Sequence, residues 1–502
     1  MKKQGLGVVE RFFKDLPKVR LLLLISGIAA LFFLGTRGLY ETTEGRYAEC
    51  AREMAAAGSW LEPVLNGVAH WTKPPLTYLA IKIPYQVLGP TTWAARYYLL
   101  FCYLIAIWAT WRLARSLWRD DSVARLCALV YASFGMPMLA SQTTTTDYPL
   151  AAGVAVAQVF FWEAFRSRAR RAVYAMWFFW GVAFLTKGPP ALLFLPAVIV
   201  TWLRLPKAER RACPLFSPLP LLLFLVVGFG WYAWEAYRHP GLLNYWWGDE
   251  VINRSFSGKF KRNPEFYQNF VIYLPAIAFG TLPWSVWLMV RWRRIWQRIR
   301  LPTGIRGFWN GLSDEALWLM WAIVFPLGVF MLSRSKLPFY LLPLFVPFAA
   351  WLGKVLMDAF GKEPWFTKRV VALWCVTVFL FVVSKGVYAY YPSQRDMALL
   401  QRRLAQVAGV KDASHLASLG DKPLNGLSYY FDREVERVPM AELPRWVARG
   451  GRRYLICSAG HRGVVMQSLT NSLCSASERR LTEKWLLVTV ENASATNSAV
   501  KP

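Results

Sequence analysis

The chain has 502 residues, of which 55% are hydrophobic, and it contains 26 tryptophans. Both values exceed those of an ordinary soluble domain, which excludes a soluble globular enzyme. The formal net charge of +29 is divided among separate clusters and never forms one basic patch, so a nucleic-acid-binding protein is excluded as well.

Apolar runs recur along residues 1–391, with charged residues between them. Counting them predicts a polytopic α-helical membrane domain of about 11–13 transmembrane helices. No signal-peptide cleavage pattern follows the first run, which we therefore interpret as a retained helix. The runs are Leu21–Leu34, Tyr97–Trp111, Leu126–Ala140, Leu150–Phe165, Val173–Leu185, Ala191–Leu203, Leu219–Tyr237, Phe270–Val290, Leu317–Leu332, Leu337–Leu352 and Val370–Tyr391.

Lysine and arginine clusters lie at alternate ends of these runs, around residues 2–20, 112–125, 166–171, 204–211, 291–300 and 354–369. With eleven spans, all of these clusters fall on one side of the membrane. The positive-inside rule makes that side cytoplasmic. We therefore expect an inner-membrane protein with a cytoplasmic N-terminus and a periplasmic C-terminal region.

The first periplasmic loop, residues 36–91, is far too long for a plain connector. It contains Glu44, Arg46 and Tyr47 at the start of an amphipathic pattern. Thr43 is a plausible N-cap, which would place Glu44 in the first helical turn. There the carboxylate could simply offset the helix dipole or could take part in chemistry.

Two lysines precede proline pairs that begin apolar segments. Lys73 comes before Pro74-Pro75, and Lys187 before Gly188-Pro189-Pro190. A lysine held near a helix N-terminus would favour a bound anion such as a phosphate. The alternative for Lys73 is a lysine that extends to the membrane interface for solvation alone.

Asp147 follows four threonines at the outer end of a predicted span, where an ionisable residue suggests function. The alternative is that Asp147 caps the helix that follows. Arg254 and Lys336 add cations on the same face. Several cations and few carboxylates suit a lipid-linked phosphate: Glu44 or Asp147 could deprotonate an acceptor hydroxyl, while Lys73, Arg254 and Lys336 could hold the departing phosphate.

Residues 392–490 lack spans and predict a small periplasmic α/β domain. The expected helices are Asp396–Val407 and Met440–Ala448, and the expected strands are Leu427–Phe431, Tyr454–Cys457 and Leu486–Val490. Cys457 and Cys474 could form a disulfide or remain two free thiols. Residues 491–502 have the composition of a disordered tail.

The motifs Glu44–Glu49, Lys73-Pro74-Pro75, Asp147, Leu185–Gly188 and Ser335–Tyr340 resemble the bacterial aminoarabinose transferases and related family 39 glycosyltransferases, which have the GT-C fold. The resemblance implies transfer of a sugar from undecaprenyl phosphate to lipid A or another envelope acceptor, with inversion. It also implies that Lys73, Arg254 and Tyr340 contact the donor phosphate, and that Asp147 and the first-loop acid are catalytic.

The sequence departs from this family where Thr43 and Thr72 replace carboxylates. Thr72 stands where the family has an acid linked to metal binding, and the chain has only four histidines. We therefore expect no metal and no cofactor. The expected partners are the polyprenyl-phosphate sugar, a lipid or glycan acceptor and membrane lipids, with no nucleic acid. The alternatives are a transporter or flippase of lipid-linked substrates and a non-catalytic scaffold.

Overall fold

The computed structural model describes residues 15–41, 43–248, 263–298, 311–420, 423–449, 451–470 and 475–491. Contacts divide the chain into two compact units. The helical unit comprises Met1–Phe32, His70–Thr77 and Arg96–Gly386, and the mixed unit comprises Phe33–Ala69, Tyr78–Ala95 and Val387–Pro502. The predicted domain boundary at residue 391 stays a prediction; this division falls at residues 386/387 and groups most of the first loop with the C-terminal region.

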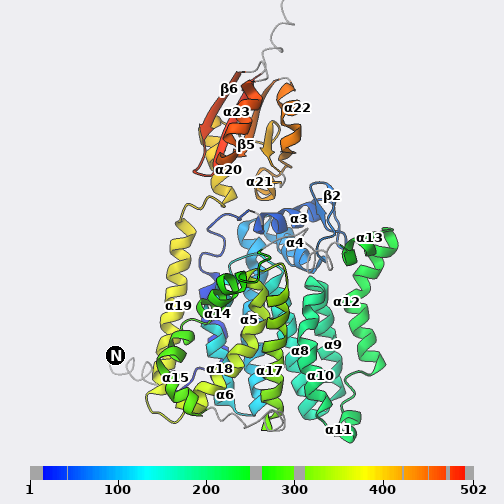
Figure 1. The fold of residues 1–502 in the computed structure, drawn as a ribbon, viewed down its shortest axis with the longest axis vertical. Helices are drawn as coiled ribbons and strands as arrows, with labels where there is room; N and C mark the ends of the chain where they lie inside the picture. Colours follow the sequence, from blue (N-terminus) through cyan, green and yellow to red (C-terminus); the bar gives the residue numbers. More distant parts are fainter. Residues whose placement is uncertain are drawn as a thin grey trace, which may run out of the picture. The chain divides into compact units, whose positions relative to one another are not determined.

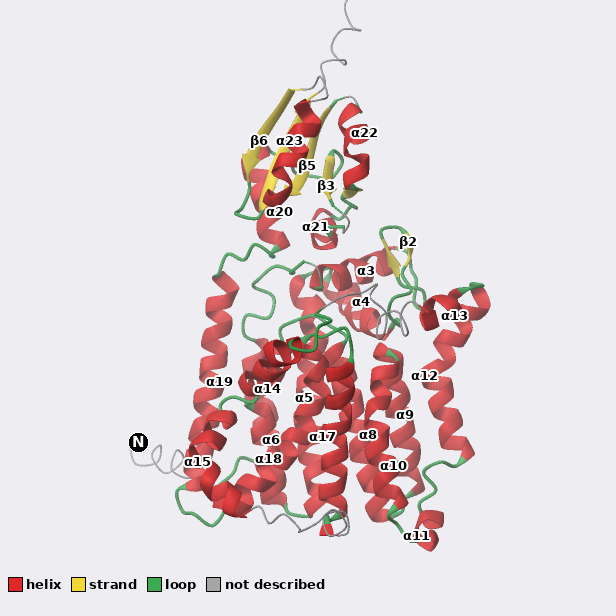
Figure 2. Cartoon of the chain, in the orientation of Figure 1, coloured by secondary structure: helices red, strands yellow, loops and turns green. Residues whose placement is uncertain are grey.

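The helical unit is a bundle of long apolar helices joined by shorter ones (Figures 1 and 2). Its elements are α2 (Val19–Leu31), α5 (Thr92–Trp118, whose first turn belongs to the mixed unit), α6 (Asp121–Ala132), α7 (Gly135–Ala140), α8 (Asp147–Ser167), α9 (Arg170–Lys187), η1 (Pro189–Phe194), α10 (Leu195–Leu203), α11 (Lys207–Ala212), α12 (Pro218–Arg238), α13 (Leu242–Asn244), η4 (Asn269–Tyr273), α14 (Leu274–Gly280), α15 (Trp284–Arg298), α17 (Asp314–Leu332), η5 (Pro338–Leu344), α18 (Phe345–Phe360) and α19 (Phe366–Tyr390, whose last turn belongs to the mixed unit).

Within the described residues, six helices are long and apolar enough to cross a membrane, or seven if the bent pair Asn269–Gly280 and Trp284–Arg294 is one span. Each of the eleven predicted apolar runs lies on one or two of the helices given above, and the exact count of 11–13 spans stays a prediction. Two of the predicted runs are broken. Leu126–Ala140 divides into α6 and α7, and the two segments of Phe270–Val290 meet at an angle of 84°. Val19–Leu31 and Pro189–Leu203 are apolar but shorter.

Glycines allow α8, α9 and α12 to pack closely. A Cβ added at Gly153 of α8 would lie 3.1 Å from the Cβ of Ala183 in α9. A Cβ at Gly181 of α9 would lie 2.9 Å from Val227 of α12. Small residues at such contacts let helix backbones approach within a membrane, where dispersion drives association.

The mixed unit contains a five-stranded sheet in the order β4-β3-β5-β7-β6. Strands β4, β3 and β5 are parallel to one another, β7 pairs antiparallel with β5, and β6 pairs antiparallel with β7. Its other elements are helices and one small hairpin. The elements are α3 (Glu44–Ala56), β1 (Val64–Leu65), β2 (Val68–Ala69), α4 (Leu76–Leu88, whose first two residues belong to the helical unit), α20 (Met397–Ala408), β3 (Leu416–Leu419), α21 (Asn425–Phe431), β4 (Glu436–Val438), η6 (Met440–Glu442), α22 (Leu443–Ala448), β5 (Arg452–Ser458), η7 (Ala459–His461), α23 (Arg462–Thr470), β6 (Ser475–Arg480) and β7 (Trp485–Glu491).

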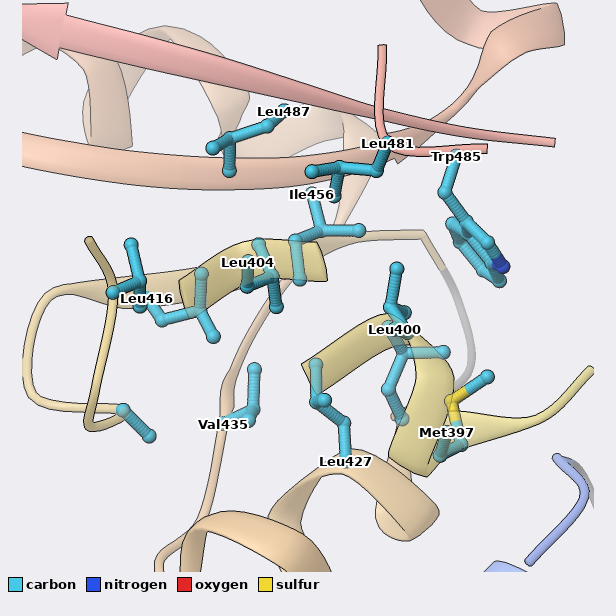
Figure 3. Packing of buried hydrophobic residues seen from close by; sticks show 13 residues of the cluster. Met397, Leu400, Leu404, Leu416, Leu427, Val435, Ile456, Leu481, Trp485 and Leu487 are labelled. Atoms are coloured by element: carbon cyan, nitrogen blue, oxygen red, sulfur yellow. The ribbon is translucent and has the colours of Figure 1, made fainter. Parts of the chain in front are cut away.

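Successive apolar side chains along the strands point to opposite faces of this sheet, so each face has its own hydrophobic core. Ile456 and Leu487 join the core formed with α20 and α21 (Figure 3), whereas Leu455 and Leu486 join the core formed with α22 and α23. Successive side chains of a strand point to opposite faces, so a sheet covered on both sides needs apolar residues at both. The predicted α/β domain is confirmed.

Four of the five predicted elements of this domain are confirmed, and one is wrong. Leu427–Phe431 was expected as a strand but lies in the helix α21. Its aromatic residues favour strands in isolation, whereas in the fold Leu427 packs against α20 as part of a helical face. Cys457 is a buried free thiol. Cys474 and the predicted disordered tail, apart from Glu491, lie outside the described residues.

The first-loop helix α3 packs against α21 through a glycine contact. A Cβ added at Gly45 would lie 2.5 Å from the Cα of Gly426, so only glycine fits there. Beside this contact, the backbone N–H of Gly426 donates to Glu41 Oε2 at 2.7 Å. Burial raises the pKa of Glu41 from 4.5 to about 7. The hydrogen bond from the Gly426 N–H and the charges of Arg46 and Lys484 lower this pKa, whereas the charge of Glu49 raises it further.

This raised pKa predicts a pH-dependent contact. Because the folded state binds a proton more tightly than the unfolded state, the contact should lose stability as pH rises from about 4.5 to about 7. We expect the amides of α21 to exchange hydrogen faster at pH 8 than at pH 5, after correction for intrinsic rates. Peptide-level hydrogen–deuterium exchange on the full chain measures this.

Glu41→Gln keeps the acceptor oxygen but cannot ionise, so its α21 protection should not vary with pH. Glu442→Gln, at an exposed position of the same unit, should behave as the wild type. An identical pH profile in Glu41→Gln and the wild type would contradict the assignment.

Candidate functional site

The α8–α9 hairpin brings together two residues forty positions apart. The hairpin turns at Arg168, which adopts left-handed backbone with φ 56°, and its two helices have 21 and 18 residues. Because the two helices are nearly equal in length, the first residue of α8, Asp147, lies beside the last residue of α9, Lys187. Gly188, with φ 80°, then ends α9 before the prolines of η1.

Asp147 and Lys187 form an ion pair at this end of the hairpin. Lys187 Nζ donates a hydrogen bond to Asp147 Oδ1, and the two side chains are 12% and 10% exposed. Charges so poorly solvated are tolerated only when paired. The helix begins at Asp147 itself, so Asp147 does not cap it, and its backbone N–H donates to Thr145 Oγ1 at 3.2 Å.

Tyr340 is the third member of the cluster. Its ring centroid lies 4.2 Å from Lys187 Nζ, a cation–π distance, and its element η5 packs against α8. Tyr273, buried in η4, lies close enough to interact electrostatically with both Tyr340 and Asp147. The structure therefore brings together three residues singled out from the sequence and adds a second tyrosine.

Lys336 lies in the loop that leads from α17 into η5, four residues before Tyr340. Its Nζ donates to the carbonyl oxygens of Ser333 at 2.7 Å and Pro264 at 3.4 Å. The side chain is buried, and this desolvation lowers the pKa of Lys336 below its usual value, while the carboxylate of Glu265 opposes the effect. A buried lysine bound mainly by carbonyl oxygens retains the capacity to bind an anion.

Lys73 precedes α4, which begins at Leu76 directly after Pro74 and Pro75, as predicted. Its Nζ donates to the carbonyl of Thr72 at 2.6 Å. Lys187, in contrast, ends α9 instead of preceding a regular helix, because the two prolines after Gly188 begin a 3-10 turn. The sequence parallel between the two lysines therefore holds only in part.

The remaining predicted site residues are Glu44, Arg46, Tyr47 and Arg254. Glu44, Arg46 and Tyr47 belong to the mixed unit, and Arg254 lies outside the described residues. Glu44 does occupy the first turn of α3, but Thr43 makes no side-chain cap there.

The carboxylate of Glu44 accepts three hydrogen bonds. Arg37 donates two hydrogen bonds to it, at 2.5 and 3.2 Å, and the backbone N–H of Tyr40 donates a third at 3.1 Å. Arg46 lies over the ring of Tyr47, 5.4 Å from the centroid, and Tyr47 packs against Tyr78. These contacts give the two residues a packing role within α3 and α4.

An aromatic cluster of the helical unit went unnoticed in the sequence. Trp71, Trp231, Tyr232 and Trp246 pack around Leu185, two residues before Lys187. Trp71 is also two residues before Lys73. Trp71, close before Lys73, was the available signal, but it was overlooked because the whole chain is rich in tryptophan.

Glu235 and His239 stand one turn apart at the end of α12, with a carboxylate oxygen 3.7 Å from the imidazole Nε2. Carboxylate and imidazole groups are ligands of divalent ions. The absence of a metal therefore stays a prediction.

Comparisons with known proteins agree with this architecture. Residues 72–234 match the family described as dolichyl-phosphate-mannose-protein mannosyltransferase. The undecaprenyl phosphate-α-4-amino-4-deoxy-L-arabinose arabinosyl transferase of Pseudomonas aeruginosa (strain LESB58) is 31% identical over 346 residues, which are 67% of this chain and 59% of the relative. A relative of the same name, numbered 2, from Pseudomonas fluorescens (strain Pf0-1) is 29% identical over 347 residues, 68% of this chain and 60% of the relative. The alignments thus span about three fifths of these relatives' own length.

Among solved structures, ArnT from Cupriavidus metallidurans bound to undecaprenyl phosphate superposes with a TM-score of 0.73 at 20% identity, covering 94% of this chain and 98% of that chain. The mycobacterial arabinofuranosyltransferase AftD gives a TM-score of 0.51 at 12% identity, covering 95% of this chain and 40% of that chain. This chain is therefore a multi-pass membrane protein with the GT-C fold, and it resembles the aminoarabinose transferases.

Proposed function

We propose that the protein transfers a sugar from a polyprenyl-phosphate donor to a hydroxyl of lipid A or another envelope acceptor. The observation that supports this most is the poorly solvated cluster of Asp147, Lys187 and Tyr340 at one end of the α8–α9 hairpin. It combines a carboxylate, a cation and an aromatic face. The P. aeruginosa relative is named for transfer from such a donor, and ArnT was solved with undecaprenyl phosphate.

The reaction forms a bond between the acceptor oxygen and the anomeric carbon and breaks the bond from that carbon to the phosphate oxygen. The phosphate leaves with the electron pair, so negative charge develops on it. Lys73, Lys187 and Lys336 are the described cations that would stabilise this charge. Arg254 is proposed as a fourth on the resemblance alone. Attack from the opposite face inverts the anomeric centre.

Asp147 is the better placed of the two proposed bases. Glu44 already accepts three hydrogen bonds, which argues for a supporting role in which it holds the first loop through Arg37. Asp147 accepts from Lys187 through one oxygen. A donor phosphate that competed for Lys187 would release this carboxylate to take the acceptor's proton, and would thereby couple donor binding to base activation.

We also propose that the protein lies in the inner membrane, with a cytoplasmic N-terminus and a periplasmic C-terminal domain. The support is the distribution of lysine and arginine clusters along the chain. A transporter would instead need ionisable residues midway along paired, broken spans. Asp147 and Lys187 lie at helix ends.

Removing the Lys73 amine should abolish transfer, because a cation near the leaving phosphate is lost. We expect Lys73→Ala to lower turnover by roughly 10²-fold or more. Mass spectrometry of envelope glycolipids, from cells that express the wild type or the variant as the only copy, measures the product. Lys354→Ala, which removes a half-buried lysine that pairs with Asp358 in the same helix, is the control and should leave the product unchanged. Wild-type product in Lys73→Ala would refute the phosphate role.

Asp147→Asn should lower the rate of transfer by roughly 10²-fold or more, since an amide cannot accept the proton. Glu163→Gln is the matched control: Glu163 lies in the same helix and pairs with Arg112, as Asp147 pairs with Lys187. The measurement is turnover of a purified polyprenyl-phosphate sugar. A full rate in Asp147→Asn would mean that the base is another residue.

Transfer should not require a divalent ion, because the lysines can neutralise the phosphate. Incubation with EDTA should therefore leave the turnover of the purified protein unchanged. Loss of turnover that a divalent ion restores would disprove metal independence and would direct attention to Glu235 and His239.

A further inference from the structure

The segment that carries Lys73 is held by an aromatic residue far along the chain. The indole Nε1 of Trp246 donates a hydrogen bond of 2.8 Å to the backbone carbonyl of Trp71. Trp71 lies two residues before Lys73, in a turn without helix or strand of its own. The position of that turn must therefore come from contacts such as this one.

Trp246 is rigidly placed for this hydrogen bond. It lies in a wide helical turn at residues 245–248, directly after α13, and is 8% exposed. Its ring packs against Trp231, with centroids 5.2 Å apart, and edge-on against Tyr232 at 4.9 Å. Both partners belong to α12, so this helix determines where the indole N–H points. Its neighbour Trp247 is 68% exposed.

The Trp71 ring is held by the same cluster. Its centroid lies 4.8 Å from that of His239 and 6.3 Å from that of Trp231. On the other side of the turn, Pro74 and Pro75 restrict the backbone. The backbone on both sides of Lys73 is therefore held in place, and the Lys73 amine donates to the carbonyl of Thr72.

The cluster also reaches the second lysine of the site. A Cβ added at Gly188, the residue after Lys187, would lie 3.2 Å from the hydroxyl of Tyr232. Leu185, two residues before Lys187, packs into the same cluster. One aromatic cluster thus touches the backbone segments that carry both lysines.

We propose that Trp246 is a positioning residue for the donor phosphate: its indole N–H fixes the Trp71 carbonyl and thereby the place from which Lys73 meets the phosphate. The proposal rests on the function proposed above. Trp246 acts through the backbone of residues 71–73 and has no part in the bond-breaking step.

The test removes the indole N–H of Trp246 and keeps an aromatic ring at this position. In Trp246→Phe, or with benzothienylalanine, whose ring has the shape of indole but no N–H, we expect KM for the polyprenyl-phosphate sugar to rise roughly 3–10-fold, while kcat stays within about twofold. This is the fold-change expected for one lost hydrogen bond. Trp247→Phe is the matched control and should leave KM unchanged.

Binding of undecaprenyl phosphate and of undecaprenol to the purified protein separates positioning from general packing. Weaker binding of undecaprenyl phosphate, with unchanged binding of undecaprenol, supports the proposal, because only the lipid with a phosphate uses Lys73. Equal weakening of both lipids, or no weakening in the benzothienylalanine variant, overturns it. A lowered melting temperature of that variant with wild-type phosphate binding also overturns it.

A double-mutant cycle with Lys73→Ala distinguishes this proposal from the function on which it rests. If Trp246 acts through Lys73, the N–H deletion should have no further effect on phosphate binding in the Lys73→Ala background. An undiminished effect there contradicts positioning of Lys73. Equal phosphate binding by the wild type and Lys73→Ala would instead refute the proposed phosphate role of Lys73.

Discussion

The burial of two opposite charges at one end of the apolar α8–α9 pair is the constraint on which the helical unit depends. Asp147 and Lys187 are each about one tenth exposed, and removing either one would leave the other charge poorly solvated and unpaired. Their meeting requires α8 and α9 to be nearly equal in length and to pack closely, which Gly153 permits at its contact with Ala183. The same close packing brings η5 and its Tyr340 against α8.

The mixed unit obeys a different constraint. Its first-loop helix and its C-terminal helix α21 meet at two glycines, so close that neither could carry a side chain without displacement of the other segment or of Met397. Glu41 accepts from the Gly426 N–H beside this contact, and Asp396 accepts from the backbone N–H of Gly38 at 2.9 Å. Segments up to 385 residues apart in the sequence thus share one compact unit.

Sequence reasoning succeeded where a local pattern determines structure. Asp396 was placed at the start of a helix and does cap α20, and the alternating strands β5 and β7 were recognised. It failed where tertiary contacts override local preference. Leu427–Phe431 is helical because α3 and α20 pack on it. Hydropathy also does not register a bend such as the 84° angle between Asn269–Gly280 and Trp284–Arg294.

The sequence by itself determined that this is a polytopic membrane protein with a C-terminal α/β domain, and it singled out Asp147, Lys187 and Tyr340. Composition, hydropathy and motif carry that information, because burial in lipid requires apolar runs and chemistry requires particular side chains. Only the tertiary structure decided that these three residues meet, that Glu44 is bound by Arg37, and that Trp246 holds the backbone before Lys73. Such contacts join residues up to 175 positions apart, and their geometry depends on how whole helices pack, which no local pattern encodes.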